Sequence, residues 1–192
     1  METQTGLTGL DKGAEELHKG RYYDAIAEGY DSLHKEEQIK KLAKILSDLP
    51  AHLIPKPSES LLDVGCGSGI STAPWDCRCT GIDPSIELIK IAQKNYPGKD
   101  FIVGHAENLP FKEKSFDFVI SITAIHNFSD IKKGILEMKR VGRKGFVFTV
   151  LRKSSNVDLI QKLLIINFRV HKIVMEDKDI IFICEGLVKG KS

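Results

Sequence analysis

The chain has 192 residues and a mass of 21.4 kDa, which is the size of one domain and not of two. Its 42% hydrophobic and 28% charged residues are ordinary globular usage, which excludes collagen-like, disordered and disulfide-scaffold proteins. The net charge is only +2, and the basic excess is confined to residues 141–192. An excess of this size is more typical of a solvated face than of a surface for nucleic acid.

The sequence shows no targeting or membrane signal. Its longest apolar stretch is shorter than the roughly 18 to 20 residues of a membrane span, and its first residues lack the regions of a signal peptide. We therefore expect no membrane association and a cytoplasmic location. The four cysteines lack C-x-x-C spacing, so we expect neither a disulfide nor a structural zinc, and we predict no metal site.

Residues 1–50 precede the strand-rich part of the chain. After a polar arm at residues 1–20, apolar side chains at helical spacing predict one helix that carries Tyr23 and Tyr30 and a second that ends at Pro50. The predicted apolar stripe of the second helix is Ile39, Leu42, Ala43, Leu46 and Leu49. A link that contains proline and serine then leads to residue 60.

From residue 61 onward, short apolar runs alternate with helical patterns. The predicted strands are 61–64, 80–83, 101–103, 116–120 and 146–150, followed by a hairpin of 171–175 and 180–184. Ser85 and Ser129 are the expected N-caps of two helices, the second of which ends at Gly142, and a third helix is expected near 157–166. This alternation predicts an α/β fold: a Rossmann-like, mainly parallel seven-stranded sheet with helices on both faces and an antiparallel C-terminal hairpin strand.

A glycine-rich loop follows the first strand, in the sequence LLDVGCGSGIST at residues 61–72. Closely spaced glycines at the carboxyl end of a strand let a ligand approach the backbone. The dinucleotide fingerprint G-x-G-x-x-G would need glycine at position 70, where the chain has Ile70, so a pyrophosphate cradle is the weaker option. Asp83 ends the second strand, where its carboxylate can accept hydrogen bonds from a ribose diol.

Several motifs agree with this arrangement. They are LDVGCGSG at 62–69, GIDPS at 81–85, AENLPF at 106–111, SFD at 115–117 and, before them, YDxxAxxYD at 23–31. With these motifs the chain resembles the class I S-adenosylmethionine-dependent methyltransferases, in particular the methyltransferase type 11 group, which includes the quinone-biosynthesis enzymes. The resemblance covers about residues 21–150 and says almost nothing about the methyl acceptor.

The resemblance implies S-adenosylmethionine as the cofactor and an enzyme that transfers its methyl group. The methionine part would lie along the three loop glycines, with Asp63 at its amino group and Asp83 at the ribose hydroxyls. The three glycines are Gly65, Gly67 and Gly69. On this basis residues 1–50 form an N-terminal arm with cofactor-covering helices, and residues 51–192 form a single Rossmann-like methyltransferase domain.

The adenine end of the cofactor would meet a second group of residues. Pro84 would flank the ring, Ala106 would donate its backbone amide to a ring nitrogen, and Glu107 would lie beside it. Tyr23 and Tyr30 would belong to the covering helices. Members of the family usually carry an acidic residue before the alanine, and this chain has His105 there, whose neutral imidazole can still accept one hydrogen bond.

The loop after the fourth strand, residues 121–128, should face the methyl group. His126 is the candidate base or acceptor-orienting group, because the ordinary pKa of histidine suits proton transfer near neutrality. The alternative is a histidine that hydrogen-bonds the loop backbone. The remaining histidines have no such placement.

The sequence leaves the methyl acceptor open. The connection between the fifth strand and the hairpin has room for one helix only, which predicts a shallow cleft and slightly favours a macromolecular acceptor, RNA or protein. A small molecule covered by the Tyr23 to Tyr30 helix is the competing interpretation. Two further alternatives are a non-catalytic cofactor-binding subunit of a complex and a nicotinamide-dependent oxidoreductase, the latter disfavoured by Ile70.

A partner surface is predicted at the third strand. The sheet order implied by the resemblance places Phe101 to Val103 at an edge, where an apolar strand can pair with another chain. Some macromolecule-modifying relatives bind a small zinc-binding activator protein there. The alternative is that Lys99, Asp100 and the preceding loop cover this edge of a monomer.

Overall fold

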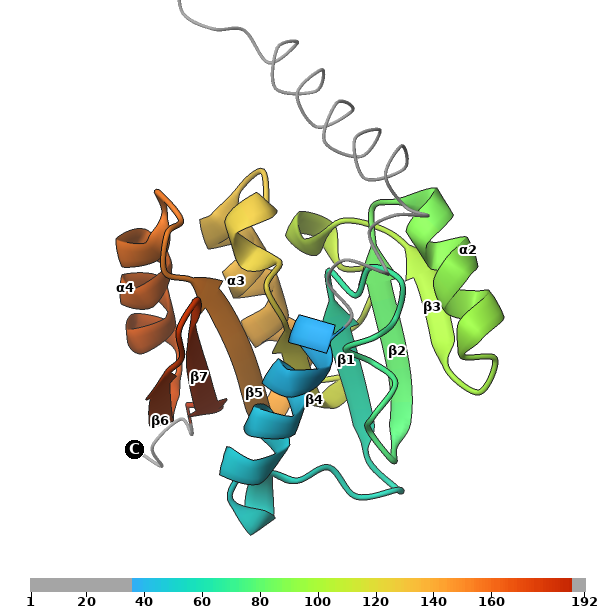
Figure 1. Cartoon of the computed structure of the whole chain (residues 1–192), viewed down its shortest axis with the longest axis horizontal. Coiled ribbons are helices and arrows are strands. Elements are labelled where there is room, and N and C mark those ends of the chain that lie inside the picture. The colour runs from blue at the N-terminus through green and yellow to red at the C-terminus, as the bar shows by residue number, and fades with distance from the viewer. Residues whose placement is uncertain (1–35, 188–192) are drawn as a thin grey trace, which may run out of the picture.

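The computed structural model describes residues 36–187, which are built around one seven-stranded sheet (Figure 1). The strands are β1 (Ser60–Val64), β2 (Arg78–Asp83), β3 (Asp100–Val103), β4 (Phe116–Ser121), β5 (Gly142–Leu151), β6 (Arg169–Met175) and β7 (Asp179–Glu185). Their order in the sheet is β3-β2-β1-β4-β5-β7-β6. Strands β1 to β5 are parallel, and β7 runs antiparallel to both β5 and β6, so the predicted fold class is confirmed.

Helices cover both faces of the sheet. They are α2 (Ile86–Asn95), α3 (Ile131–Val141), α4 (Val157–Asn167) and the helical residues 36–48, with short turns η1 (Ala51–Leu53), η2 (Ala106–Asn108) and η3 (Ile125–Asn127). Helices α3 and α4 pack in one core cluster with Leu62 and Phe148, whereas Ile45 of helix 36–48 packs in a second cluster with Leu61 and Val147. Burial on both sides explains why the inner strands β4 and β7 are almost continuously apolar. No helix within residues 36–187 is long and apolar enough to cross a bilayer.

The helix ends follow local chemistry, with one correction. Ser85 caps α2 as predicted, since its hydroxyl accepts a hydrogen bond from Leu88 N at 3.2 Å. The cap of α3 is Asp130 and not Ser129: the Asp130 carboxylate accepts from Lys133 N at 2.9 Å, and a negative charge is favoured at the positive end of the helix dipole. The chain then passes from α3 directly into β5 at Gly142, so β5 begins four residues earlier than the predicted 146.

The inward face of helix 36–48 also differs from the prediction. Ile39 is 50% exposed, whereas Ile45 is fully buried and Lys41 is only 7% exposed. A charged residue is accepted on the buried face because the Lys41 ammonium lies 2.7 Å from a carboxylate oxygen of Asp179. Ile39, Leu42 and Leu46 of this helix line a groove of about 380 Å³, together with Ile70 and its neighbours in the first crossover. That crossover is built from turns without a helix.

Candidate cofactor and acceptor site

The glycine loop forms the carboxyl end of β1. Gly65, Gly67 and Gly69 have φ angles of +76°, +53° and +88°, in the left-handed region that favours glycine. A Cβ atom at Gly65 would lie 2.4 Å from the Cβ of Ala124, so this part of the loop packs closely on the segment after β4. A Cβ at Gly67 would have only a Leu88 methyl group at 4.0 Å beside it. The loop is therefore closed toward β4 and open at Gly67, as a cradle for a ligand requires.

Asp63 lies beneath the loop and is fully buried. One carboxylate oxygen, Oδ2, accepts hydrogen bonds from the Ser71 hydroxyl at 2.5 Å and the Thr72 hydroxyl at 2.7 Å. Among the described residues, the other oxygen, Oδ1, has no hydrogen-bond partner. Burial raises the pKa of Asp63 to about 6, although the two hydroxyls oppose this rise. A buried carboxylate with one unused oxygen fits a positively charged ligand group such as the amino group of S-adenosylmethionine.

Asp83 connects the glycine loop to α2. Its Oδ2 accepts from the backbone N–H of Gly67 at 2.9 Å, and its Oδ1 accepts from the backbone N–H of Ser85 at 3.0 Å. The side chain is 8% exposed at the end of β2. A carboxylate can accept about four hydrogen bonds, so Asp83 can hold the loop and also accept from a ribose diol.

The residues predicted around the adenine lie at the ends of the neighbouring strands. Pro84 is exposed directly after Asp83, and Ala106 is buried in η2, which follows β3. Glu107 accepts a hydrogen bond from the backbone N–H of Asp130 at 3.2 Å and so joins η2 to the start of α3. Tyr23 and Tyr30 lie outside the described residues.

A buried polar cluster lies beside the loop after β4. Thr123 has a φ of +58°, a conformation that β-branched residues rarely adopt. Its backbone N–H donates to the Thr149 hydroxyl at 2.6 Å, and the Lys41 ammonium donates to its side-chain oxygen at 2.6 Å. The Lys41 and Asp179 side chains are 6% and 3% exposed. A strained backbone held by several polar contacts is typical of functional sites.

His126 follows this cluster, on η3, and is half-buried. Its Nδ1 atom is buried and has no hydrogen-bond partner within residues 36–187, and the same is true of Oδ1 of Asp179. Burial lowers the pKa of His126 below 6.5; the charge of Asp179 opposes this shift, and the charge of Lys41 adds to it. The imidazole is therefore neutral at pH 7, and the unpartnered nitrogen can accept a proton.

Sequence reasoning missed most of this polar cluster. Lys41 stands inside the predicted apolar stripe of its helix, and Asp179 follows the polar turn of the hairpin, so neither position suggests a site. Thr123 lies in the loop 121–128, which we expected to face the methyl group, and this position is the one sequence signal that points to it. Lys41 and Asp179 come close to Thr123 only through the fold.

The site and the strand order define a Rossmann-like methyltransferase fold, and comparisons with known proteins agree. Residues 62–150 match the family described as "Methyltransferase domain". An uncharacterized protein of Methanocaldococcus jannaschii is 32% identical over 166 residues, which are 85% of this chain and 64% of that protein. The demethylmenaquinone methyltransferase of Thermotoga maritima is 32% identical over 139 residues, 69% of this chain and 61% of the enzyme. The chain thus spans less than two thirds of the length of both relatives.

Two solved structures share the fold at low sequence identity. The magnesium protoporphyrin IX methyltransferase of Synechocystis with bound S-adenosylmethionine has a TM-score of 0.72 and 16% identity, over 96% of this chain and all of that chain. The complex between the Haloferax volcanii Trm112 methyltransferase activator and a putative methyltransferase has a TM-score of 0.70 and 16% identity, over 86% of this chain and 98% of that chain. Residues 62–150 therefore carry a methyltransferase domain, and the chain is similar to methyltransferases, one of which has bound S-adenosylmethionine.

The buried charge of Asp63 predicts a gain in stability on its removal. The pKa rise from 3.8 to about 6 means that the folded chain holds this proton more tightly than the unfolded chain. Charged Asp63 therefore lowers stability as the pH rises from about 4 to 6, by up to about 3 kcal/mol at neutral pH. We expect Asp63→Asn to raise the free energy of unfolding near pH 7 and to change it little near pH 4, measured by urea denaturation without cofactor.

The matched control is Ser71→Ala, which removes a hydroxyl that stabilises the charged carboxylate. This variant should be less stable than the wild type near pH 7. An Asp63→Asn variant that is also less stable than the wild type near pH 7 would contradict the inference that the buried charge of Asp63 is destabilising.

Proposed function

We propose that this chain transfers the methyl group of S-adenosylmethionine to an acceptor that enters beside His126, at the carboxyl end of β4. One observation supports this most directly: Gly65 of the glycine loop packs against Ala124 of the segment after β4. The glycine loop, held by the Asp83 carboxylate, lies on one side of this contact, and the polar cluster beside His126 lies on the other. Cofactor and acceptor regions are therefore adjacent.

The residues of the cofactor region would bind and orient S-adenosylmethionine. Asp83 would accept hydrogen bonds from the ribose, Asp63 would face the amino group, and Gly67 would leave space for the methionine part. Pro84, Ala106 and Glu107 would surround the adenine. When bound, S-adenosylmethionine supplies an electrophilic methyl group on its sulfonium, so the chain's main task is to place the acceptor in line with that group.

The acceptor region would supply orientation and one proton transfer. An acceptor oxygen or nitrogen that still carries a proton must lose it as the bond to the methyl carbon forms. Neutral His126 can take that proton on an imidazole nitrogen, and the Asp179 carboxylate then stabilises the imidazolium. Lys41 and Thr123 would hold the loop in its strained conformation.

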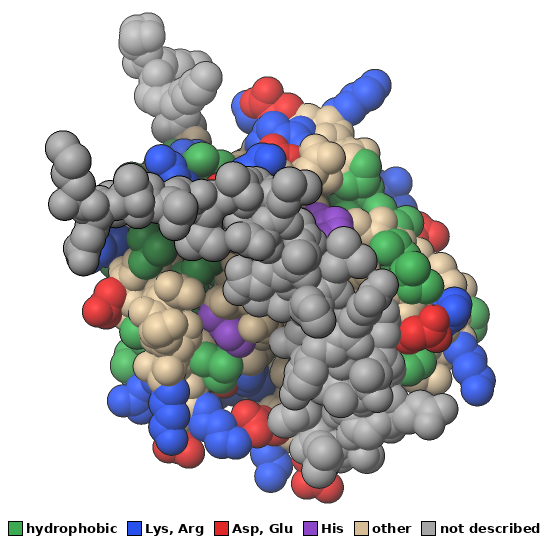
Figure 2. Space-filling model, turned by 90° about the horizontal axis from the view of Figure 1, so that it is seen from above, with side chains coloured by type: hydrophobic (Ala, Val, Ile, Leu, Met, Phe, Trp, Pro, Cys, Tyr) green, Lys and Arg blue, Asp and Glu red, His purple; other side chains and the backbone are tan. Residues whose placement is uncertain are grey.

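A macromolecular acceptor, RNA or protein, is our first proposal for the substrate. It is supported by the short connection from β5 to β6, which contains only residues 152–156, α4 and Phe168 and no covering insertion. Figure 2 shows basic and acidic side chains interspersed on the described surface at this end, which favours protein over RNA. A small acceptor is the second candidate, since a demethylmenaquinone methyltransferase is among the relatives. Transfer of labelled methyl into protein, RNA or small-molecule fractions distinguishes them.

The ribose assignment is tested with Asp83→Ala. Loss of charge-assisted hydrogen bonds, each worth roughly 1.5 to 3 kcal/mol, should weaken S-adenosylmethionine binding at least tenfold in calorimetry. Asp100→Ala is the matched control, because Asp100 is exposed at the opposite end of the neighbouring strand. Unchanged affinity in a folded Asp83→Ala protein would refute the ribose role.

The role of His126 is tested with His126→Ala. We expect normal cofactor affinity and roughly a 100-fold loss of methyl transfer. In the wild type, transfer should decline only below about pH 6.5, because burial lowers the pKa of His126 from that value, and the variant should lose this acidic limb. The control is Asn127→Ala, an exposed neighbour on the same turn. Full activity of His126→Ala with an unchanged pH profile would return His126 to a structural role.

We also propose a small activator protein as a partner at the edge of β3. The structure places β3 at the end of the sheet, with Val103 48% exposed. Gly104 N donates to Asp83 O at 3.0 Å, and N–H directions alternate along a strand, so Val103 N–H points away from the sheet. The outward Phe101 carbonyl is already bonded by Gln93 at 3.0 Å, so a partner strand would pair first through Val103.

Val103→Pro tests this partner surface. Proline is tolerated on an edge strand where the N–H faces outward, so the variant should fold and bind cofactor normally. It should lose at least tenfold in affinity for the Trm112-type activator of the same source organism. Ile173→Pro on β6, the opposite edge, should keep that affinity. A wild-type chain that is fully active alone and binds no activator would exclude the partner.

A further inference from the structure

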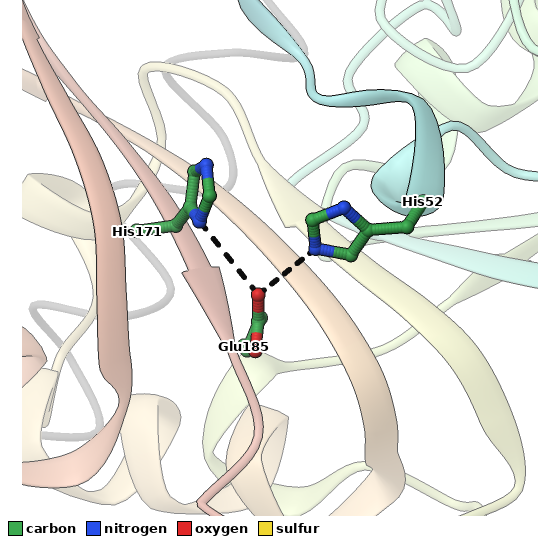
Figure 3. A group of neighbouring side chains, drawn as sticks. All are labelled: His52, His171 and Glu185. Atoms are coloured by element: carbon green, nitrogen blue, oxygen red, sulfur yellow. Dashed lines mark hydrogen bonds and ion pairs between the residues drawn. The ribbon is translucent and has the colours of Figure 1, made fainter.

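A cluster of metal-ligating side chains lies far from the glycine loop. His52 of η1, His171 of β6 and Glu185 of β7 converge, and Figure 3 shows both imidazole rings turned toward the Glu185 carboxylate. Glu185 pairs with Gly145 near the start of β5, so the cluster lies at the amino end of the parallel strands. The proposed cofactor region is at the other end, and the proposed methyl transfer uses none of these three residues.

The spacing of the three ligand atoms suits a small divalent cation. Nε2 of His52 is 3.0 Å and Nδ1 of His171 is 3.7 Å from the same carboxylate oxygen, Oε1 of Glu185. All three ligand atoms lie within 4.8 Å of one another. Zinc binds such atoms at about 2.0–2.2 Å with tetrahedral angles, which separates neighbouring ligand atoms by about 3.3–3.6 Å. The two distances to Oε1 of Glu185, 3.0 and 3.7 Å, lie on either side of this range.

The cluster leaves one carboxylate oxygen to a cation and is accessible from solvent. The Arg169 guanidinium lies 3.6 Å from the other oxygen, Oε2, and leaves Oε1 to the two imidazoles. The His52 and His171 side chains are 60% and 40% exposed, so an ion and a completing water can reach them.

We propose that His52, His171 and Glu185 form a binding site for a zinc-like divalent transition metal. Two imidazole nitrogens and one carboxylate oxygen are ligands that zinc prefers, and water would complete a four-coordinate site. The spacing of these residues along the chain, at positions 52, 171 and 185, carries no recognisable metal motif, which is why the sequence predicted none.

The site would fasten the segment before β1 to the C-terminal hairpin. Three ion pairs already join these parts: Lys41 with Asp179 at 2.7 Å, Lys172 with Asp48 at 2.6 Å and Lys178 with Glu37 at 2.7 Å. A metal held by η1, β6 and β7 would add a further link, at the end where η1 leads into β1. Binding to the folded chain alone would raise its stability.

The test uses the full chain without an affinity tag, ZnCl2 for calorimetry and CoCl2 for visible absorption. The wild type should bind one equivalent with micromolar affinity, show cobalt bands typical of imidazole nitrogen ligands, and melt at a higher temperature with zinc than with EDTA. His52→Ala and His171→Ala should bind at least tenfold more weakly and lose the zinc-dependent rise in melting temperature. His105→Ala, an exposed histidine elsewhere, is the matched control for metal binding and should bind zinc like the wild type.

The outcomes separate a metal site from a simple ion pair. Stoichiometric binding that His52→Ala and His171→Ala both weaken, with unchanged melting in EDTA, supports the proposal. A wild type that binds neither metal at micromolar concentration refutes it. Binding that both variants keep also refutes it, because the metal must then lie elsewhere, for example at the thiols of Cys77 and Cys79, whose sulfur atoms are 3.6 Å apart. Cofactor binding is measured separately and does not enter these outcomes.

Discussion

The buried ion pair between Lys41 and Asp179 joins the parts of the chain that build the proposed acceptor region. Lys41 comes from helix 36–48 and Asp179 begins β7, while the same ammonium also bonds Thr123 after β4. Moving two charges out of water costs free energy. The attraction between them offsets this cost only when the ion pair has good geometry and additional hydrogen bonds. Loss of either partner would leave the other charge buried, at about 3–5 kcal/mol. Helix, hairpin and loop are therefore held in one arrangement, with His126 beside it.

Two buried carboxylates have different roles at the proposed cofactor end. Asp83 accepts backbone N–H groups through both oxygens, so its charge is compensated and it organises the glycine loop. Asp63 is compensated at one oxygen only, and burial raises its pKa to about 6. An uncompensated charge lowers the stability of the free protein and favours a cationic ligand group. Such a compromise between stability and binding is common at functional sites.

The two ends of the sheet are specialised in different ways. The carboxyl end carries the glycine loop, the strained Thr123 and the half-buried His126, all features suited to binding and chemistry. The amino end carries charged networks, such as Asp117 with Arg143 at 2.9 Å and Lys144 at 2.8 Å. Although burial alone would raise the pKa of Asp117, its hydrogen bonds hold it well below the usual value. The His52, His171 and Glu185 cluster belongs to this end.

The sequence alone determined the features that depend on neighbouring residues. The seven strands, the Ser85 cap, the glycine loop and the position of Asp83 at a strand end were all readable, because strand periodicity, capping and turn chemistry act over a few residues. The Ser129 cap was wrong, because Ser129 and Asp130 are both good cap residues and only the helix geometry selects Asp130. The inward stripe of helix 36–48 was wrong in part, because its buried Lys41 needs a partner that local pattern cannot reveal.

Tertiary structure alone decided which distant residues meet. Lys41 and Thr123 are 82 residues apart and His52 and Glu185 are 133 apart, yet both pairs are in hydrogen-bond contact. Such pairs form when the order of strands brings β4, β5 and β7 side by side, with helix 36–48 across them. No local periodicity encodes that order, because it follows from how the whole sheet buries its two faces. Local chemistry therefore determined the glycine loop. The packing of the complete sheet determined the polar cluster of Lys41, Thr123 and Asp179, and also the cluster of His52, His171 and Glu185 at the opposite end.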